Sequence, residues 1–269
     1  MKVICISANN PIFIELQYKT LQKFLKEDYE FIIFNDGKDW PDITNFNDAT
    51  QGRYAIIQKC IELNIQCINI PNSHHRNNTS ASHRHSDSLK YALDYMKNNL
   101  DEYLMIDSDM FLVDELNMND YRKYSCACVL QERPNMKYFW PNFFYINMHK
   151  IQHAHLLNLS ILPGGDTGSA SSVWLKTMMV NNGDDIYFIK HLFSNGWDET
   201  QFPANLNKEF LTYLKFDLRN NNNKFFTEIY DNKFLHYRAG TNWMNQSKEL
   251  HDKNISVLAS VIDRIITLK

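Results

Sequence analysis

Four short apolar segments, separated by stretches with helical spacing, make up the first 107 residues of the chain. The apolar segments are residues 3–7, 30–37, 65–70 and 103–107, and the stretches between them cover 12–25, 49–64 and 86–99. Apolar residues in these stretches recur three and four positions apart, as on one face of a helix. Strands that alternate with helices are typical of a parallel sheet covered by helices on both faces. The sequence therefore predicts an α/β fold.

The second half of the chain has a less regular pattern. Segments 124–130 and 143–147 have the composition of strands, 149–158 and a segment from Ser169 onward that of helices, and 233–243 that of a strand running into a loop. Residues 249–268 are amphipathic and predict a C-terminal helix. We see no clear linker or internal repeat. We therefore expect one domain over residues 1–245 with a mixed, mostly parallel central sheet, and a C-terminal helix (246–269) packed on it.

Composition and charge argue against several kinds of partner. Lys and Arg number 28 against 31 Asp and Glu, so the net charge is −3 and no basic surface for nucleic acid or membrane is indicated. No segment approaches the roughly 20 apolar residues of a membrane span, and the N-terminus does not resemble a secretory signal. The five cysteines are an odd number, and most lie in strand-like segments. We interpret them as reduced core residues of a cytoplasmic protein.

Polar residues follow each of the four predicted strands. In α/β sheets of this type, ligands bind beyond the carboxyl ends of the strands. The topology thus predicts that the four polar segments line one binding site. These segments are Ser7 to Asn9, Asn35 with Asp36, Asn72 to His74, and Asp107 to Asp109.

Asp107 ends the fourth apolar segment and Asp109 follows two residues later, in the stretch YLMIDSDMFLVDE. On an extended chain, residues two positions apart point to the same side and lie about 6.6 Å from each other. Two carboxylates this close repel each other unless a cation binds them or both stay hydrated. A divalent ion such as Mn²⁺ or Mg²⁺ meets this need and keeps open positions for a diphosphate. The alternative is a loop with two hydrated acids.

An apolar strand, an Asp-x-Asp pair and a second apolar strand, about 100 residues into an α/β chain, resemble the GT-A-fold glycosyltransferases. The resemblance extends to about residue 243. It implies a Rossmann-like GT-A fold with a nucleotide-binding half (1–110) and an acceptor and sugar half (111–245). It also implies transfer of a hexose or related sugar from a nucleoside-diphosphate sugar, with UDP favoured, to a glycan or other hydroxyl acceptor. Asp107 and Asp109 would then bind Mn²⁺ or Mg²⁺.

The same resemblance suggests residues that contact the donor. Family members often carry an acid after the second strand that recognises the base or ribose, and Asn35 and Asp36 hold that place. Arg84 would bind the diphosphate, and Asp87 would accept sugar hydroxyls or pair with Arg84. The alternative for Arg84 and Asp87 is the exposed first turn of a helix. Further predicted donor contacts at this edge are Ser7, Asn9 and Ser108.

His236, in the stretch FLHYRAGTNW, resembles the late His-x-x-x-Gly loop of glycogenin-like, metal-dependent transferases. This implies that His236 is the third metal ligand and that Gly240 and its backbone contact phosphate. The lysine that is frequent in the family's loop is absent, so Arg238 is predicted to replace it. The alternative for His236 is a core histidine with a local hydrogen bond.

The candidate catalytic residues are acids in the second half of the chain. An inverting enzyme needs a carboxylate base near the acceptor hydroxyl, whereas a retaining enzyme often has only a side-chain oxygen or amide near the anomeric carbon. Asp166 lies in a glycine-rich loop, and Asp198 and Glu199 resemble the late acidic motif of the family. A position at the N-terminus of a helix is the alternative for all three.

Two other classes of protein stay open. One is a haloacid-dehalogenase-type phosphatase with Asp107 as nucleophile, although in that family the Asp-x-Asp pair lies near the N-terminus. The other is a non-catalytic module that holds a nucleotide or glycan. The seven histidines between residues 74 and 155 form only a loose set. Because a zinc site needs closely placed ligands with their own supporting partners, no zinc site is predicted.

Overall fold

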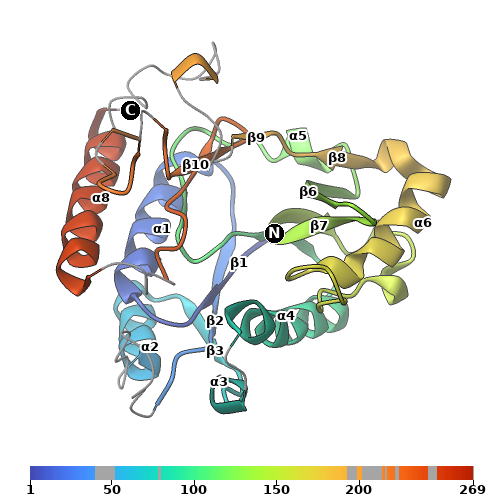
Figure 1. The fold of residues 1–269 in the computed structure, drawn as a ribbon, viewed down its shortest axis with the longest axis horizontal. Helices are drawn as coiled ribbons and strands as arrows, with labels where there is room; N and C mark the ends of the chain where they lie inside the picture. Colours follow the sequence, from blue (N-terminus) through green and yellow to red (C-terminus); the bar gives the residue numbers. More distant parts are fainter. Residues whose placement is uncertain are drawn as a thin grey trace.

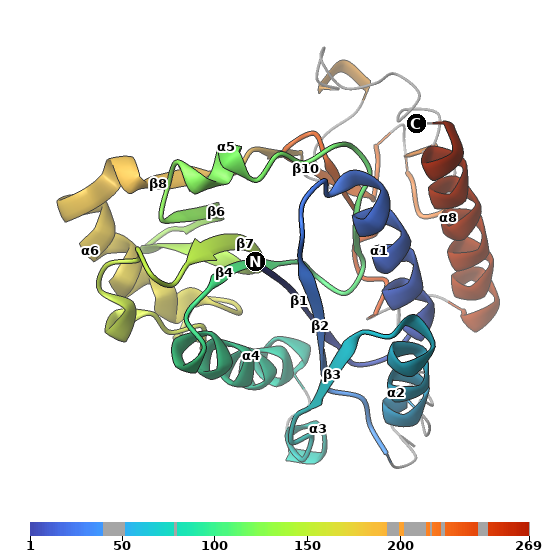
Figure 2. The same ribbon diagram turned by 180° about the vertical axis from the view of Figure 1, so that it is seen from behind.

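The centre of the molecule is a seven-stranded mixed sheet with helices on both faces, as seen in Figures 1 and 2. The structure is a computed structural model and describes residues 1–39, 52–77, 80–192, 199–201, 214–215, 217–221, 224–241 and 247–268. The strand order is β3-β2-β1-β4-β7-β6-β8. The strands are β1 (Lys2–Ser7), β2 (Glu30–Asn35), β3 (Gln66–Asn69), β4 (Glu102–Met105), β6 (Cys126–Arg133), β7 (Met136–Asn147) and β8 (Ile186–Phe188).

The first four strands of the chain form the parallel part of this sheet. β1 pairs in parallel with both β2 and β4, and β2 pairs in parallel with β3. β7 runs antiparallel to β4 and β6, and β8 lies parallel to β6. Val3, Ile4 and Cys5 of β1 have no exposed surface, as expected for a parallel strand covered on both faces.

Two sets of helices cover the two faces of the sheet. Helices α1, α2 and α8 lie on one face, where their apolar residues share a core with Val3 and Cys5 of β1. Helices α4 and α6 lie on the other face and share a core with Ile4 and Ile6. Successive side chains of a strand enter opposite cores because a strand is pleated. The helices are α1 (Pro11–Phe24), α2 (Gly52–Leu63), α4 (Ala81–Asn98), α6 (Ser172–Asn182) and α8 (Lys248–Leu268).

A second, four-stranded antiparallel sheet has the order β5-β11-β10-β9. His236 pairs with Met110 across β11 and β5, and Glu228 pairs with His236 across β10 and β11. Since β5 begins directly after Asp109, this sheet brings a histidine and a glutamate from late in the chain beside the acidic pair. Its strands are β5 (Met110–Leu112), β9 (His191–Leu192), β10 (Glu228–Tyr230) and β11 (Phe234–His236).

The predicted fold class is confirmed: the sheet is mixed and mostly parallel, helices flank it, and the chain has a C-terminal helix. Two predicted helices differ from the structure. Helix α4 begins at Ala81, five residues before the predicted start at residue 86. Residues 149–158 form turns and the single 3₁₀ turn Ala154–Leu156 in place of a helix, because His153 has a left-handed backbone (φ 55°) that a helix does not accommodate. The boundary predicted at residues 245 and 246 lies outside the described residues.

Several short elements complete the described part of the chain. Two of them, α3 and α5, are four-residue helices, and the others are single 3₁₀ turns. They are α3 (His74–Asn77), α5 (Asn119–Arg122), and the turns Ala154–Leu156, Ser169–Ser171, Gly183–Asp185 and Glu199–Gln201.

None of the helices in the described ranges is both long enough and apolar enough to cross a membrane. All five cysteines are free thiols, and Cys67 is partly exposed while the other four are buried. The burial of these four agrees with the core role expected from the sequence. The cytoplasmic location stays a prediction.

Candidate functional site

A cavity of about 280 Å³ opens at the carboxyl ends of β1, β2 and β4. The sequence placed a binding site at this edge of the sheet, and residues from both halves of the chain reach it. The lining residues that matter most are Asn9, Asp36, Arg84, His85, Asp107, Ser108, Asp109, Asn142 and His236.

Asp107 and Asp109 lie in a tight turn between β4 and β5. The amide of Met110 donates to the carbonyl of Asp107 at 3.1 Å, and the amide of Ser108 donates to the Asp107 carboxylate at 2.8 Å. The side chain of Gln17, on α1, donates to the carbonyls of Asp107 (2.7 Å) and Met110 (3.0 Å). The prediction of an extended chain here is therefore wrong. The turn, which Gln17 stabilises, determines the positions of the two carboxylates.

His236 lies between the two carboxylates. Its Nε2 is 3.1 Å from Asp109 Oδ1 and 3.6 Å from Asp107 Oδ2. Its Nδ1 is 2.7 Å from Glu228 Oε2, and the same oxygen accepts a 2.8 Å hydrogen bond from the Tyr230 hydroxyl. The imidazole is thus held from both sides by acidic groups.

Burial and charge shift the pKa values of this cluster strongly. Burial raises the pKa of Asp107, and the nearby charge of Asp109 raises it further. Burial opposes a charge on His236, but Asp109 and Glu228 outweigh it and raise the pKa of His236 to about 10. Burial also works against ionised Glu228, yet its hydrogen bond with His236 lowers the pKa of Glu228 overall. At neutral pH the imidazolium therefore serves as the cation between the acids.

The same three side chains fit a divalent ion. One ligand atom each from Asp107, Asp109 and His236 lies within 4.8 Å of the others. Two carboxylates and one imidazole form a donor set that suits Mn²⁺, and an ion there would replace the imidazolium proton as the balancing charge. The structure thus brings together all three predicted metal ligands, while the binding of an ion to them stays a prediction.

Gly240 holds Asp109 in place. Its amide donates to Asp109 Oδ2 at 2.6 Å, and the amide of Tyr237 donates to the Asp109 carbonyl at 2.8 Å. A Cβ atom at position 240 would lie 2.7 Å from the Tyr237 ring and 3.0 Å from Asp109 Cβ, so the close approach requires glycine. The phosphate contact predicted for Gly240 stays a prediction.

Two residues that the sequence did not single out complete the cluster. Asn142 Nδ2 donates to Asp107 Oδ2 at 2.7 Å, and Asn142 Oδ1 is 2.8 Å from His85 Nε2. Glu228 is the other, through its contact with His236. A polar side chain inside an apolar strand was the available signal for Asn142. Glu228 carried no such signal, because its partner lies on a strand that the sequence did not pair with it.

Three predicted donor contacts lie near the end of β1 and in the acidic turn. Ser108 and Asn9 line the cavity, and the Asn9 side chain donates to the carbonyl of Thr241 at 3.1 Å. Ser7 is buried, and its hydroxyl donates to the carbonyl of Asn9 at 3.3 Å. Ser7 therefore supports Asn9. It is not itself among the described residues that line the cavity.

Asn35 orders the loop after β2. Its Nδ2 donates to the carbonyl of Arg53 (3.0 Å) and to Asn69 Oδ1 (2.9 Å), and its Oδ1 accepts from the amide of Gly37 (2.9 Å). Asn35 is not among the described residues that line the cavity, and its contact with a nucleotide stays a prediction.

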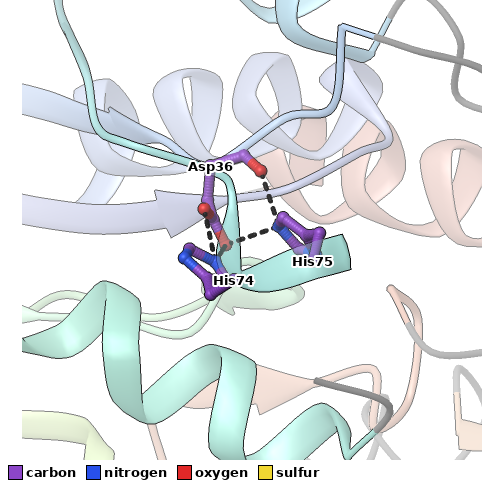
Figure 3. A group of neighbouring side chains, drawn as sticks. All are labelled: Asp36, His74 and His75. Carbon is purple, nitrogen blue, oxygen red and sulfur yellow. Dashed lines mark hydrogen bonds and ion pairs between the residues drawn. The ribbon is translucent and has the colours of Figure 1, made fainter. Parts of the chain in front are cut away.

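Asp36 lines the cavity. Its side chain meets two histidines, as Figure 3 shows. His74 Nε2 is 3.0 Å from Asp36 Oδ1, and His75 Nε2 is 3.0 Å from Asp36 Oδ2. The hydroxyl of Ser88 donates to Asp36 Oδ2 at 2.7 Å. Burial alone would raise the pKa of Asp36, but the contacts with both histidines lower it overall. The contact of Asp36 with a base or ribose stays a prediction.

Arg84, Asp87 and Arg238 differ in their positions. Arg84 lines the cavity, as its predicted role requires. Asp87 pairs with Lys90 at 2.8 Å on the exposed side of α4. The carbonyl of Arg238 accepts a hydrogen bond from Arg219 at 2.6 Å. Within the described part of the chain, neither Asp87 nor Arg238 belongs to the cavity lining.

Neither of the two predicted catalytic acids that the structure describes, Asp166 and Glu199, is among the described residues that line the cavity. The carboxylate of Asp166 accepts a hydrogen bond from the amide of Thr167 at 2.8 Å, in the loop before α6. Glu199 begins a short 3₁₀ turn. Asp198 lies outside the described residues. The catalytic roles of all three stay predictions.

This chain shows only limited similarity to known proteins. No protein-family model matches the chain, and no curated protein does. Galactosyltransferase LgtC, in complex with donor and acceptor sugar analogues, is similar at 13% identity and a TM-score of 0.32, over 56% of this chain and 59% of that one. This alignment therefore spans less than two thirds of LgtC.

Two further solved structures are similar to larger parts of the chain. Mouse xyloside xylosyltransferase 1, in its apo form, has 9% identity and a TM-score of 0.39, over 70% of this chain and 85% of that one. An active-site mutant of LgtC has 11% identity and a TM-score of 0.43, over 97% and 96%. Because these scores are low, the fold described above rests on the strand order and pairing of this chain.

Proposed function

We propose that this chain is a metal-dependent glycosyltransferase with a GT-A-type fold. It would transfer a sugar from a nucleoside-diphosphate sugar, with a UDP-sugar favoured, to a glycan or other hydroxyl acceptor. The observation that supports this most is the convergence of Asp107, Asp109 and His236 on a cavity at the carboxyl ends of parallel strands. A diphosphate bound there would lie where an ion between these side chains can reach it.

Asp107, Asp109 and His236 would hold Mn²⁺ or Mg²⁺ in this proposal. When bound, such an ion neutralises the negative charge of the departing nucleoside diphosphate. The chain's own contribution is to hold the three ligands in place. Glu228 orients His236 through its 2.7 Å contact, and the Gly240 amide fixes Asp109. Supporting partners of this kind orient metal ligands and tune their affinity.

Arg84, Asn9 and Ser108 are the proposed donor contacts, because all three line the same cavity. The guanidinium of Arg84 can form two parallel hydrogen bonds with a phosphate group, and the amide of Asn9 can bind hydroxyl or carbonyl groups. A base or ribose contact by Asp36 would use its Oδ1 atom, which accepts no hydrogen bond from the described residues.

The acids Asp166, Asp198 and Glu199 are proposed for the sugar and acceptor side. Asp166 would approach a substrate from the glycine-rich loop that precedes α6. A carboxylate within hydrogen-bond reach of the acceptor hydroxyl would accept its proton as the new glycosidic bond forms. Asp166→Asn should then lower kcat and leave the binding of the nucleoside diphosphate unchanged.

A nucleotide screen followed by turnover assays tests the proposal. UDP, GDP, CDP and dTDP would be compared by thermal shift with and without Mn²⁺, and the corresponding sugar donors would then be tested for turnover. We expect stabilisation by one nucleotide that requires Mn²⁺, and release of that nucleotide from its sugar donor. The Asp109→Asn variant should lose both, while Asp120→Asn, which changes an exposed carboxylate on α5, should keep both.

The same assays separate the two rival functions. Hydrolysis of p-nitrophenyl phosphate that requires Mg²⁺ and Asp107, with no turnover of any sugar donor, would support a phosphatase. Nucleotide binding that requires Mn²⁺, without turnover of any donor, would support a binding module. No metal-dependent response to any of the four nucleotides would overturn the proposal.

A further inference from the structure

A second cluster of ligand-type side chains lies at the end of β2. Asp36 comes from the loop after this strand, and His74 and His75 open the short helix α3 (Figure 3). Both imidazoles present Nε2 to the same carboxylate, at 3.0 Å from Oδ1 for His74 and 3.0 Å from Oδ2 for His75. The two rings lie side by side, with their centroids 4.5 Å apart.

We infer that Asp36, His74 and His75 form a second metal site, which binds a zinc-type divalent ion. One ligand atom from each residue lies within 4.8 Å of the others. Two imidazole nitrogens and one carboxylate oxygen are a ligand set that Zn²⁺ takes in three-ligand sites, with the fourth position open. The sequence predicted no zinc site because the histidines are loosely spaced along the chain, but folding brings two of them to one acid.

The burial of this cluster points to a ligand. The side chains of Asp36, His74 and His75 are only 4%, 11% and 6% exposed. His74 Nε2 lies 3.0 Å from Asp36 Oδ1, but its hydrogen bond goes to Oδ2 at 3.2 Å. The buried Oδ1 therefore accepts no hydrogen bond from the described residues. Most buried polar atoms in proteins are satisfied, so a buried carboxylate oxygen that accepts no hydrogen bond calls for an explanation. An ion bound to Oδ1 would satisfy this oxygen directly.

The surrounding residues hold the carboxylate in a fixed position. Ser88, buried on α4, donates to Asp36 Oδ2 at 2.7 Å and leaves Oδ1 for an ion. The next residue in the loop is also fixed, because the carbonyl of Gly37 accepts hydrogen bonds from Arg53 (2.9 Å) and Asn72 (2.8 Å). A hydrogen bond from outside the ligand set that orients a ligating carboxylate is a regular feature of metal sites.

The spacing of the ligand atoms is close to that of a bound ion. Ligands at about 2.0–2.2 Å from Zn²⁺ in a tetrahedron lie roughly 3.3–3.6 Å from each other. The observed contacts of 3.0 Å are shorter than this and would widen by a few tenths of an ångström. Both imidazoles would then carry their proton on Nδ1 and present the Nε2 lone pair. Asp36 and His75 line the cavity, so the open position of the ion would be reached from it.

This inference does not depend on glycosyl transfer. The cluster contains none of Asp107, Asp109 and His236, and its ligands favour zinc where that cluster favours Mn²⁺ or Mg²⁺. A bound ion would occupy the Oδ1 atom that a base or ribose contact of Asp36 requires. The two roles of Asp36 therefore exclude each other at any one time.

Metal titration of the whole chain tests the inference. Protein stripped with EDTA would be titrated with Zn²⁺ against a fluorescent zinc indicator, and with Co²⁺ while the visible absorption of four-coordinate cobalt is recorded. The measurement would be repeated on Asp109→Asn to remove the other cluster. We expect one equivalent of zinc to remain bound in Asp109→Asn. We expect His74→Ala and His75→Ala each to weaken that binding by more than about 100-fold, beyond the effect of losing a supporting partner.

Matched controls separate this site from general zinc binding by histidines. His83, exposed near the start of α4, is the control, and His83→Ala should bind zinc as the wild type does. His75→Gln, a polar replacement that does not ligate through imidazole, should lose zinc even where the alanine variant is less stable. Unchanged zinc affinity in both His74→Ala and His75→Gln would overturn the inference, as would an equal loss in His83→Ala.

Discussion

The two clusters that face the cavity have opposite proportions of carboxylate and imidazole. In one, Asp107 and Asp109 share His236, and Asp109 together with Glu228 raises the pKa of that histidine against the effect of burial. In the other, His74 and His75 share Asp36 and lower the pKa of its carboxylate. Each cluster thus stabilises the charged form of its minority group. If both clusters bind ions, the one rich in oxygen should favour Mn²⁺ or Mg²⁺ and the one rich in nitrogen should favour zinc.

The clusters also differ in how the fold assembles them. His236 and Asp109 are 127 positions apart and meet through the antiparallel pairing of β11 with β5. Asp36 and His74 are 38 positions apart and belong to consecutive strand–helix units of the parallel half. The first cluster therefore depends on the second sheet being formed, whereas the second depends on neighbouring parts of the parallel half: the ends of β2 and β3, the start of α3, and Ser88 on α4.

The largest effect is expected from Asp109→Asn. The substitution removes a carboxylate charge that contacts both His236 and the Gly240 amide. If the cluster holds the ion of a glycosyltransferase, turnover of the sugar donor at saturating Mn²⁺ should fall by about 100-fold or more. Asp36→Asn should lower turnover far less, since it leaves this cluster intact. Donor turnover by Asp109→Asn within a few-fold of the wild type would contradict the role given to this cluster.

Glu228→Gln should have the next largest effect. Glu228 contacts His236 through Nδ1 and does not itself supply a ligand, so it is a positioning residue. Loss of such a partner weakens metal binding by about 10–100-fold. We expect the Mn²⁺ concentration for half-maximal activity to rise by that factor, with kcat at saturating Mn²⁺ close to that of the wild type. Glu115→Gln changes an exposed glutamate after β5 and should leave both values unchanged. A fall in kcat that excess Mn²⁺ does not restore would argue against a positioning role.

The parallel half of the fold and the place of the site could be predicted from the sequence. The strands were recognisable because β1 to β4 are nearly continuous apolar segments, and parallel strands align their carboxyl ends by topology. Asp107 and Asp109 were found for that reason. The prediction that an extended chain brings them together was wrong, because a side chain from α1, Gln17, folds the segment into a turn.

The second half could be predicted only in part. His236 was found through a resemblance in its loop, but its partner Glu228 was not, because antiparallel pairing between short strands depends on long-range register. The prediction of a helix at 149–158 was wrong because His153 has a left-handed backbone, which the spacing of apolar residues does not reveal. His74 and His75 looked unrelated to Asp36 because a linear spacing does not show that α3 turns back over the end of β2.

The pH dependence of stability should distinguish the clusters in protein kept free of metal. His236 has a pKa of about 10 in the folded chain, against about 6.5 when unfolded. Its contribution is fully present below pH 6.5 and is lost as pH rises towards 10, by at most about 1.4 kcal/mol per pH unit. Urea unfolding at pH 7, 8 and 9 should therefore show a stability difference between wild type and His236→Gln that shrinks with rising pH.

The Asp36 cluster should lose its contribution to folding stability at low pH. The pKa of Asp36 is lowered in the folded chain, so its contribution is present above the unfolded value of about 3.9 and is lost as pH falls through the folded value. Asp36→Asn should thus change how the free energy of unfolding depends on pH below pH 4. Between pH 7 and 9 this dependence should stay that of the wild type. If Asp36→Asn removed the alkaline slope and His236→Gln did not, the charge assignments of the two clusters would be reversed.

The smallest effect is expected from Ser88→Ala. The substitution removes one buried hydrogen bond to Asp36 Oδ2, which is worth about 0.5–1.5 kcal/mol. The melting temperature in EDTA should fall by about 1–6 °C, whereas Ser260→Ala, at an exposed position on α8, should change it little. Zinc affinity should also fall, because Ser88 orients the carboxylate, while the response to Mn²⁺ stays that of the wild type. An equal loss of the Mn²⁺ response would mean that the two clusters act as one network, since Ser88 contacts Asp36 and none of the three residues around His236.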